Sequence, residues 1–126
     1  MIPLLVEASP GFDPMWREFQ SEWTSDQERP YYLALGNFAR HMSSLMCAAE
    51  DATLHRIFDT VECLLVEGDD YVKQAAAIGL LEDLQNTNLH KGSTPEQFVS
   101  YLRPQSLRWW KKIDEFWTRG VPIVDD

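Results

Sequence analysis

The chain has 126 residues, 44 % of them hydrophobic and 25 % charged, and its 20 acidic residues outnumber 11 basic ones to give a net charge of −9. This length allows one hydrophobic core, and we predict a single domain over residues 1–126 with a short acidic C-terminal tail at residues 121–126. The negative field repels nucleic acid and anionic membranes and would attract a basic protein partner, although the charge by itself is explained at least as well by solubility.

The N-terminal region predicts one helix and no targeting segment. The apolar run in the first ten residues, MIPLLVEASP, is too short for a signal peptide or a membrane span, so we expect a cytoplasmic protein. Asp13 followed by Pro14 is typical of a helix start. Apolar residues then recur at helical spacing, at Phe12, Met15, Trp16, Phe19 and Trp23.

Two further helices are predicted before the middle of the chain. The first begins at Pro30 and continues to about Glu50, with an apolar stripe that includes Leu35, Ala39 and Met42. The second has Thr53 as its N-cap and Gly68 at its C-terminal end. Its stripe is formed by Leu54, Ile57, Phe58, Val61, Leu64 and Leu65.

Residues 72–88 predict a central helix. They are strong helix formers, with apolar side chains on nearly every side and an Ala/Gly centre, and such a helix is surrounded by others. Asp69 or Asp70 is expected to cap it. Because the link at residues 67–70 is short, this helix and the preceding one should form an antiparallel hairpin that resembles one HEAT-like unit.

The C-terminal region predicts a short helix and a long one. The sequence Ser93-Thr94-Pro95-Glu96 has the chemistry of a capping box and should start a helix that ends near Leu102. A last helix from Pro104 to Gly120 should pack through Trp110, Ile113 and Trp117, with Trp109 and Phe116 beside them. The predicted fold is therefore all-α, a compact bundle of about six helices with a buried central helix and one HEAT-like helical hairpin.

The chain resembles a family of small, uncharacterised, all-helical bacterial proteins that form a domain of unknown function. The segments that carry this resemblance are PGFDPMW, YLALGNFARH, VECLLVEGDDYVKQAAAIGLLEDLQN and YLRPQSLRWWKKIDEFW, in that order along the chain. The resemblance implies a fold but no activity and no catalytic residues. The chain also resembles small acidic immunity proteins that neutralise secreted bacterial toxins.

Glu82 and Asp83 are the most unusual acids, because they lie in the helix that we expect to be mostly buried. Adjacent helical positions differ by about 100°, so both should not point at one spot. In a structural interpretation one is exposed and the other bonds a helix end or Arg40. In a functional interpretation one of them contacts a ligand in a cleft.

No motif predicts an enzyme, a metal site or another cofactor. His41, His55 and His90 are scattered, and although His55 and Asp59 are one helical turn apart, no motif supplies further ligands. Ser43 and Ser44 lack a nucleophile motif. Cys47 and Cys63 are expected to be buried thiols. In the pair Trp109-Trp110, we expect one ring to be buried and the other partly covered.

The uneven charge suggests where a partner would bind. Residues 1–28 carry six acids and one base, residues 50–70 carry seven acids and one arginine, and residues 91–120 carry six bases and three acids. We expect a non-enzymatic, immunity-type inhibitor that occludes the active surface of a basic toxin domain. The residues predicted to bind the partner are Glu67, Asp69, Asp70, Tyr31 and Tyr32.

Two alternatives stay open at this point. One is a small helical adaptor that binds a peptide or a partner helix, and the other is a cryptic metal protein or enzyme built on His41, His55, Glu82 or Asp83. The sequence does not identify the partner, the oligomeric state or the acidic surface that binds.

Overall fold

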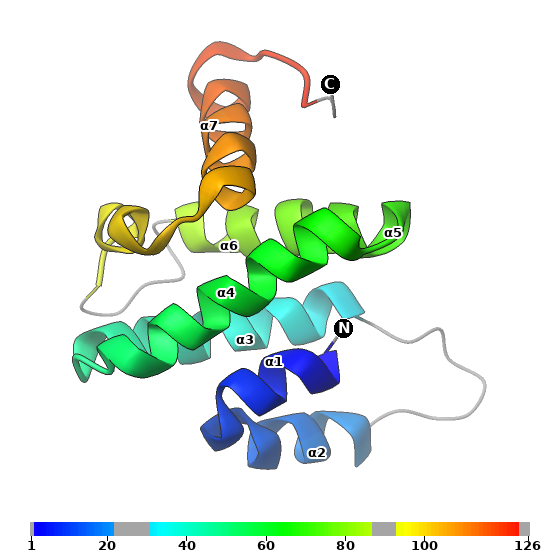
Figure 1. Cartoon of the computed structure of the whole chain (residues 1–126), viewed down its shortest axis with the longest axis vertical. Coiled ribbons are helices and arrows are strands. Elements are labelled where there is room, and N and C mark those ends of the chain that lie inside the picture. The colour runs from blue at the N-terminus through cyan, green and yellow to red at the C-terminus, as the bar shows by residue number, and fades with distance from the viewer. Residues whose placement is uncertain (1, 22–30, 87–92, 124–126) are drawn as a thin grey trace.

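The computed structural model describes residues 2–21, 31–86 and 93–123, and every regular element in these ranges is helical (Figure 1). The prediction of an all-α fold is thereby confirmed. The elements are α1 (Ile2–Ala8), the short 3-10 helix η1 (Pro10–Phe12), α2 (Asp13–Ser21), α3 (Tyr31–Cys47), α4 (Asp51–Glu67), α5 (Asp70–Gln74), the π-helical η2 (Ala75–Leu81), α6 (Glu82–Gln85), the longer 3-10 helix η4 (Pro95–Tyr101) and α7 (Pro104–Arg119).

Helix α4 lies across the middle of the molecule and joins its two ends. It packs against α1 on one side and α7 on the other, and also contacts α3 and the segment formed by α5 and η2 (Figure 1). Helices α1 and α2 lie together at one end of the molecule, whereas α7 stands across the helices beneath it at the other end. Its C-terminal turns therefore project beyond the bundle.

The apolar spacing of the first ten residues predicted no helix, but α1 is formed there. Ile2, Leu5 and Ala8 are buried and occupy one face at a spacing of three residues. A helix of seven residues is too short to be stable in isolation. Its packing on α4 stabilises it, and this contact is not visible in local sequence.

Several predicted helix ends are confirmed by their local chemistry. The side chain of Asp69 accepts a hydrogen bond from the amide of Val72 at 2.9 Å and caps α5. At the predicted start of η4 the amide of Thr94 donates to the side chain of Gln97 at 2.8 Å, so the capping residue is Gln97, one position after the predicted segment at residues 93–96. Gly120 ends α7 with a left-handed φ of 68°, a conformation that favours glycine.

Three predicted boundaries differ from the structure. The central helix was predicted to continue to Asn88, but it ends at Gln85, and Asn86 is extended. Helix α3 ends at Cys47, not near Glu50, because Ala49 adopts a φ of 57° and the amide of Glu50 bonds back to the carbonyl of Leu45. Helix α4 then begins at Asp51, ahead of the predicted cap Thr53. The reversal at Ala49 does not depend on a glycine, so the residue types gave no signal for it.

Residues 70–85 form one continuous helix through α5, η2 and α6. Its middle is π-helical, and the amide of Glu82 bonds to the carbonyl of Ala77, five residues earlier. This helix packs against α3, α4 and α7. Its buried residues are Ala75, Ala76, Ala77, Gly79, Leu80, Leu81 and Leu84.

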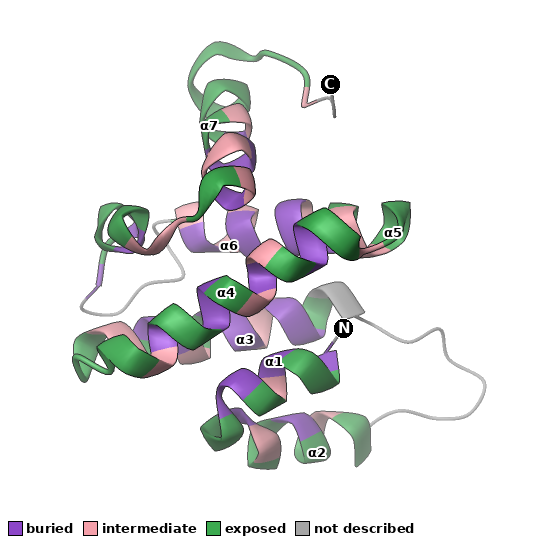
Figure 2. Ribbon diagram, viewed as in Figure 1, coloured by how far each residue is buried: buried purple, intermediate pink, exposed green. Residues whose placement is uncertain are grey.

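The tryptophans of α7 divide between the core and the surface in a way that the sequence did not predict. Trp109 and Trp110 are both buried, with only 6 % and 9 % of their surface exposed. Trp117 and Phe116 were expected to pack in the bundle, but they are 59 % and 41 % exposed on the projecting end of α7 (Figure 2). Helical spacing predicts which residues share a face, but not where a neighbouring helix stops covering that face.

The prediction of buried thiols is wrong, because Cys47 and Cys63 are both exposed. Cys47 is the last residue of α3, beyond the part of that helix that other elements cover. Cys63 faces outward on α4, and its thiol donates to the carboxylate of Glu67 at 3.3 Å. This hydrogen bond and the negative charge of Glu67 raise the pKa of the Cys63 thiol.

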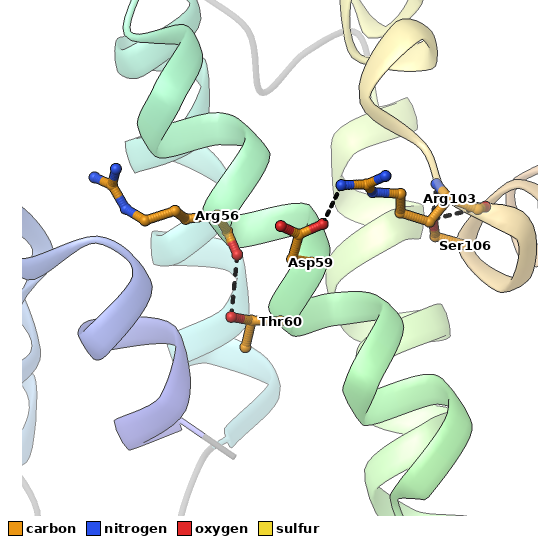
Figure 3. Close-up of polar contacts among 5 residues, drawn as sticks. All are labelled: Arg56, Asp59, Thr60, Arg103 and Ser106. Atoms are coloured by element: carbon orange, nitrogen blue, oxygen red, sulfur yellow. Dashed lines mark hydrogen bonds and ion pairs between the residues drawn. The ribbon is translucent and has the colours of Figure 1, made fainter.

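The C-terminal part of the chain, formed by η4 and α7, is attached to α4 by polar contacts. Arg103, at the start of α7, forms an ion pair with Asp59 of α4 (Figure 3). One end of α4 makes a second contact, in which the Tyr101 hydroxyl donates to the carboxylate of Asp51. The acids of α4 therefore meet the basic C-terminal region of their own chain.

Glu62 of α4 supplies the cap that α7 lacks in its own sequence. Its two carboxylate oxygens accept from the backbone amides of Gln105 at 2.7 Å and Ser106 at 2.9 Å. These amides are among the four at a helix start that have no intrahelical partner. The negative charge also lies at the positive end of the helix dipole. Three acids from the acidic stretch at residues 50–70 are thus occupied within the molecule.

Candidate functional site

An open cleft of about 660 Å³ lies where α6, η4 and α7 meet. Its apolar part is formed by Pro95, Val99, Trp110 and Trp117. The amide of Gln85 donates to the backbone carbonyl of Trp110 at 2.8 Å, which ties α6 to α7 at the cleft. We call this feature the α6–α7 cleft, and its lining residues are Glu82, Asp83, Gln85, Asn86, Pro95, Glu96, Val99, Trp110, Lys111, Asp114 and Trp117.

The charge of the α6–α7 cleft is mainly negative. Four carboxylates line it, from Glu82, Asp83, Glu96 and Asp114, against the single base Lys111 among the lining residues. Within residues 2–21, 31–86 and 93–123, no base lies within ion-pairing distance of these carboxylates. The cleft therefore has an excess of negative charge next to apolar surface, an arrangement that suits a cationic ligand.

Burial shifts the titration of the two acids on α6. Desolvation, reinforced by the negative charge of Glu82, raises the pKa of Asp83 to about 6, while the positive charge of Arg40 opposes the shift. Desolvation also raises the pKa of Glu82. Gly36 of α3 lies beside Asp83, and a Cβ atom on this glycine would be 3.4 Å from a carboxylate oxygen. Asp83 is thus enclosed by α3 on one side and open to the cleft on the other.

Both Glu82 and Asp83 line the α6–α7 cleft, although adjacent helical positions were not expected to face one spot. The cleft is wide enough at the end of the helix for both neighbours to reach it. Their predicted structural contact, an ion pair between one of them and Arg40, is not formed within 4 Å in the described part of the chain. Arg40 instead donates to the side chain of Asn37.

The predicted partner-binding residues lie elsewhere, around the turn between α4 and α5. Glu67 accepts from Cys63, and Asp69 caps α5, so both have local roles. Asp70 lines a separate cavity of about 240 Å³ with Lys73, Gln74, Ile78, Trp109 and Ile123. The side chains of Tyr31 and Tyr32 lie outside the described residues. Of the three predicted acids, Asp70 lines this second cavity, and none of the three lines the α6–α7 cleft.

The residues that sequence analysis missed are Glu96, Val99, Asp114 and Trp117. Asp114 and Trp117 are three residues apart on α7 and so share a helix face. That spacing was available from the sequence, but Trp117 was assigned to the core. Glu96 and Val99 come from η4, and only the fold brings them to α7.

The histidines predicted as possible ligands have other contacts. The Nε2 atom of His41 lies 2.7 Å from the hydroxyl of Ser9, and burial lowers the pKa of this histidine. Ser9 is only 2 % exposed, and neither residue lines the cleft, so the pair has the geometry of a structural hydrogen bond. The ring of His55 packs on Tyr101 with centroids 4.7 Å apart. His90 lies outside the described residues.

No cluster of three or more histidine, cysteine or acidic side chains in the described ranges is arranged to hold a metal ion. His55 and Asp59, the pair predicted to be within reach of a metal, contact Tyr101 and Arg103 instead. The same ranges contain no helix with the length and apolar character needed to cross a membrane.

Comparison with known proteins adds a family to this description. A family described as a domain of unknown function (DUF7674) matches residues 2–118, which include all of α1 and nearly all of α7. The chain belongs to this family. The match therefore covers every element that lines the α6–α7 cleft. No curated protein and no solved structure matches the chain.

Proposed function

We propose that this DUF7674 chain is a non-enzymatic protein-binding protein that receives a basic partner at the α6–α7 cleft. Its specific role in this proposal is that of an immunity-type inhibitor, which occludes the active surface of a cognate bacterial toxin. The supporting observation is the cleft itself, in which four carboxylates adjoin an exposed tryptophan. Binding sites between proteins commonly combine an aromatic anchor with a charged rim.

We place the partner-binding surface in the α6–α7 cleft and no longer at the turn between α4 and α5, which was predicted from the sequence. Of the acids predicted to bind the partner, Glu67 accepts a hydrogen bond from Cys63 and Asp69 caps a helix. Carboxylates that already bond within the chain have less free charge to offer a partner. The acids of the cleft form no ion pair among the described residues, so their charge is available to attract a cation.

A second candidate function is a helical adaptor that binds a peptide. Helix α4 and the helix at residues 70–85 are joined only by Gly68 and Asp69 and are in contact, as in one HEAT-like hairpin with a buried central helix. The open form of the cleft between α6, η4 and α7 also favours an extended peptide ligand. An adaptor should bind several partners weakly, whereas an inhibitor should form one tight complex.

The test begins with a tagged pull-down from native cells, followed by native mass spectrometry of the eluted protein. We expect one basic partner in a one-to-one complex. Several weak partners would favour the adaptor, and a stoichiometric metal in the eluted protein would overturn the proposal. Capture alone does not locate the interface, so two matched variants are then compared for affinity.

The two variants each remove three negative charges. The cleft variant carries Glu82→Gln, Asp83→Asn and Asp114→Asn, and the turn variant carries Glu67→Gln, Asp69→Asn and Asp70→Asn. Asparagine is also a good N-cap, so the turn variant should retain the cap of α5. We expect the cleft variant to weaken binding by at least about 30-fold and the turn variant by less than about threefold. The reverse order would assign the interface to the turn.

A further inference from the structure

The end of α7 beside the cleft is unusual because none of the other elements in the described part of the chain covers it. Every residue from position 114 to position 119 is exposed, and Figure 2 shows this stretch in green above the bundle. It nevertheless contains two aromatic rings, Phe116 and Trp117. Their rings meet edge to face with centroids 5.5 Å apart, which orients the indole of Trp117 at the cleft.

Trp109, on the same helix, has two cationic side chains close to its indole ring. The guanidinium carbon of Arg108 lies 5.1 Å from the ring centroid of Trp109, and the ammonium of Lys112 lies 5.6 Å from it. Both distances are within the range of a cation–π interaction. Among the described residues, no cation is placed in this way over Trp117. The ring of Trp117 is 59 % exposed and can accept a cation from outside.

Carboxylates from two elements, α7 and α6, line the same cleft as Trp117. Asp114 lies one helical turn before Trp117 on the same face of α7, and Glu82 and Asp83 come from α6. A guanidinium is planar, so it can lie flat on an indole while its N–H groups bond to carboxylates at its edge. An ammonium is compact and more strongly hydrated, and therefore fits this combination less well.

We infer that the α6–α7 cleft recognises a single arginine side chain of the partner, which stacks on Trp117 and bonds through its guanidinium to Asp114 and the acids of α6. This inference rests on the proposed function and names the group that is bound there. Lys111 lines the same cleft, and among the described lining residues it is the base that would compete with the arginine. The site is thus selective for a planar cation next to an aromatic ring.

The test uses Nα-acetyl-arginine methylamide as a small probe of the intact protein. The indole N–H signal of Trp117 is assigned in proton–nitrogen correlation spectra by its loss in Trp117→Phe, and the probe is titrated against it. We expect a saturable shift of this signal with a dissociation constant in the millimolar range. The neutral isostere Nα-acetyl-citrulline methylamide should give no saturable shift, and the lysine analogue should bind at least about fivefold more weakly.

Three variants check the geometry. Asp114→Asn should weaken binding of the arginine probe about fivefold, and Lys111→Met should strengthen it about twofold. Glu67→Gln, outside the cleft, should leave binding unchanged. Equal binding of the citrulline or lysine probe, or an unshifted Trp117 signal, would overturn the inference.

The two proposals can fail separately. If the arginine probe binds as expected but no protein partner is captured from native cells, the proposed function fails and the arginine site stands. If a partner is captured and Trp117→Leu changes its affinity no more than Tyr71→Leu, which alters an exposed aromatic residue outside the cleft, the arginine site fails and the protein-binding function stands.

Discussion

At the residue scale, Asp83 combines partial burial with proximity to the cleft. Its pKa is raised from 3.8 to about 6, so the folded protein holds a proton on this group at pH values where the unfolded chain has lost it. A carboxyl group whose pKa is raised by folding lowers the free energy of unfolding at pH values above its pKa in the folded protein. This loss of stability disappears as the pH falls below the pKa of the same group in the unfolded chain. Ionisation of Asp83 therefore lowers the stability of the folded protein.

The substitution Asp83→Asn should remove that cost. After allowance for its partial exposure, we expect the free energy of unfolding to rise by about 1 kcal/mol at about pH 7.5 and to be unchanged at about pH 3.5. Urea unfolding of both proteins across this pH range measures the difference. A variant that is less stable at the higher pH would show that the charge attraction to Arg40 outweighs desolvation.

At position 68 a glycine is needed for a steric reason. Its φ of −69° and ψ of 158° are open to any residue. However, a Cβ atom at this position would lie 2.4 Å from the carbonyl oxygen of Leu64 and 2.6 Å from a methyl carbon of Val72. The glycine was correctly predicted to mark the end of a helix, but the reason is close approach and not a left-handed backbone.

We therefore expect Gly68→Ala to lower the free energy of unfolding by about 2 kcal/mol, as overpacking does. Gly36→Ala is the matched control, since its added Cβ would approach Asp83 no closer than 3.4 Å. That substitution gains helix propensity and should be neutral or mildly stabilising. Equal losses for the two variants, measured by thermal and urea unfolding, would contradict the steric explanation.

At the scale of elements, the start of α7 depends on α4. Arg103 cannot cap a helix with an oxygen atom, and the hydroxyl of Ser106 accepts from the amide of Arg103 at 2.8 Å. The amides of Gln105 and Ser106 then bond to the carboxylate of Glu62. A tertiary contact thus does the work of a local N-cap, which explains why α7 begins at Pro104 without an Asp, Asn, Ser or Thr before it.

Glu62→Ala should lower the free energy of unfolding by about 2 kcal/mol, because it leaves two partly buried amides without an acceptor. Glu115→Ala, which removes an exposed acid from α7, should change it by less than about 0.5 kcal/mol. Urea unfolding compares the two. A small loss for Glu62→Ala, equal to that of the control, would show that water caps the helix equally well.

At the scale of the whole molecule, the net charge of −9 acts on a basic partner over a longer distance than any single contact. The cleft and turn variants each remove three negative charges, so their long-range fields weaken to a similar extent. We therefore expect both variants to slow association with the captured partner to a similar degree, while only the cleft variant accelerates dissociation by about tenfold or more. Surface plasmon resonance at two salt concentrations separates the rates. Faster dissociation of the turn variant would contradict the assignment of the cleft.

The sequence by itself determined the helical class and most helix ends. Asp69, Gly120 and the pairing of Thr94 with Gln97 act within one turn of the chain, so the residues that produce these ends are adjacent to them in sequence. For the same reason a boundary such as Ala49, which has no glycine or proline, was missed. The short helix α1 was missed because its stability comes from α4.

Only the tertiary structure decided which side chains are covered. Trp109 and Trp117 lie on the same helix, yet one is buried and the other exposed, because the bundle ends between them. Residues 50–70 were recognised as an acidic stretch, but only the fold shows that two of its acids, Asp59 and Glu62, bond to the start of α7. Spacing along a chain determines which residues share a face, whereas burial and free charge depend on which other element reaches that face.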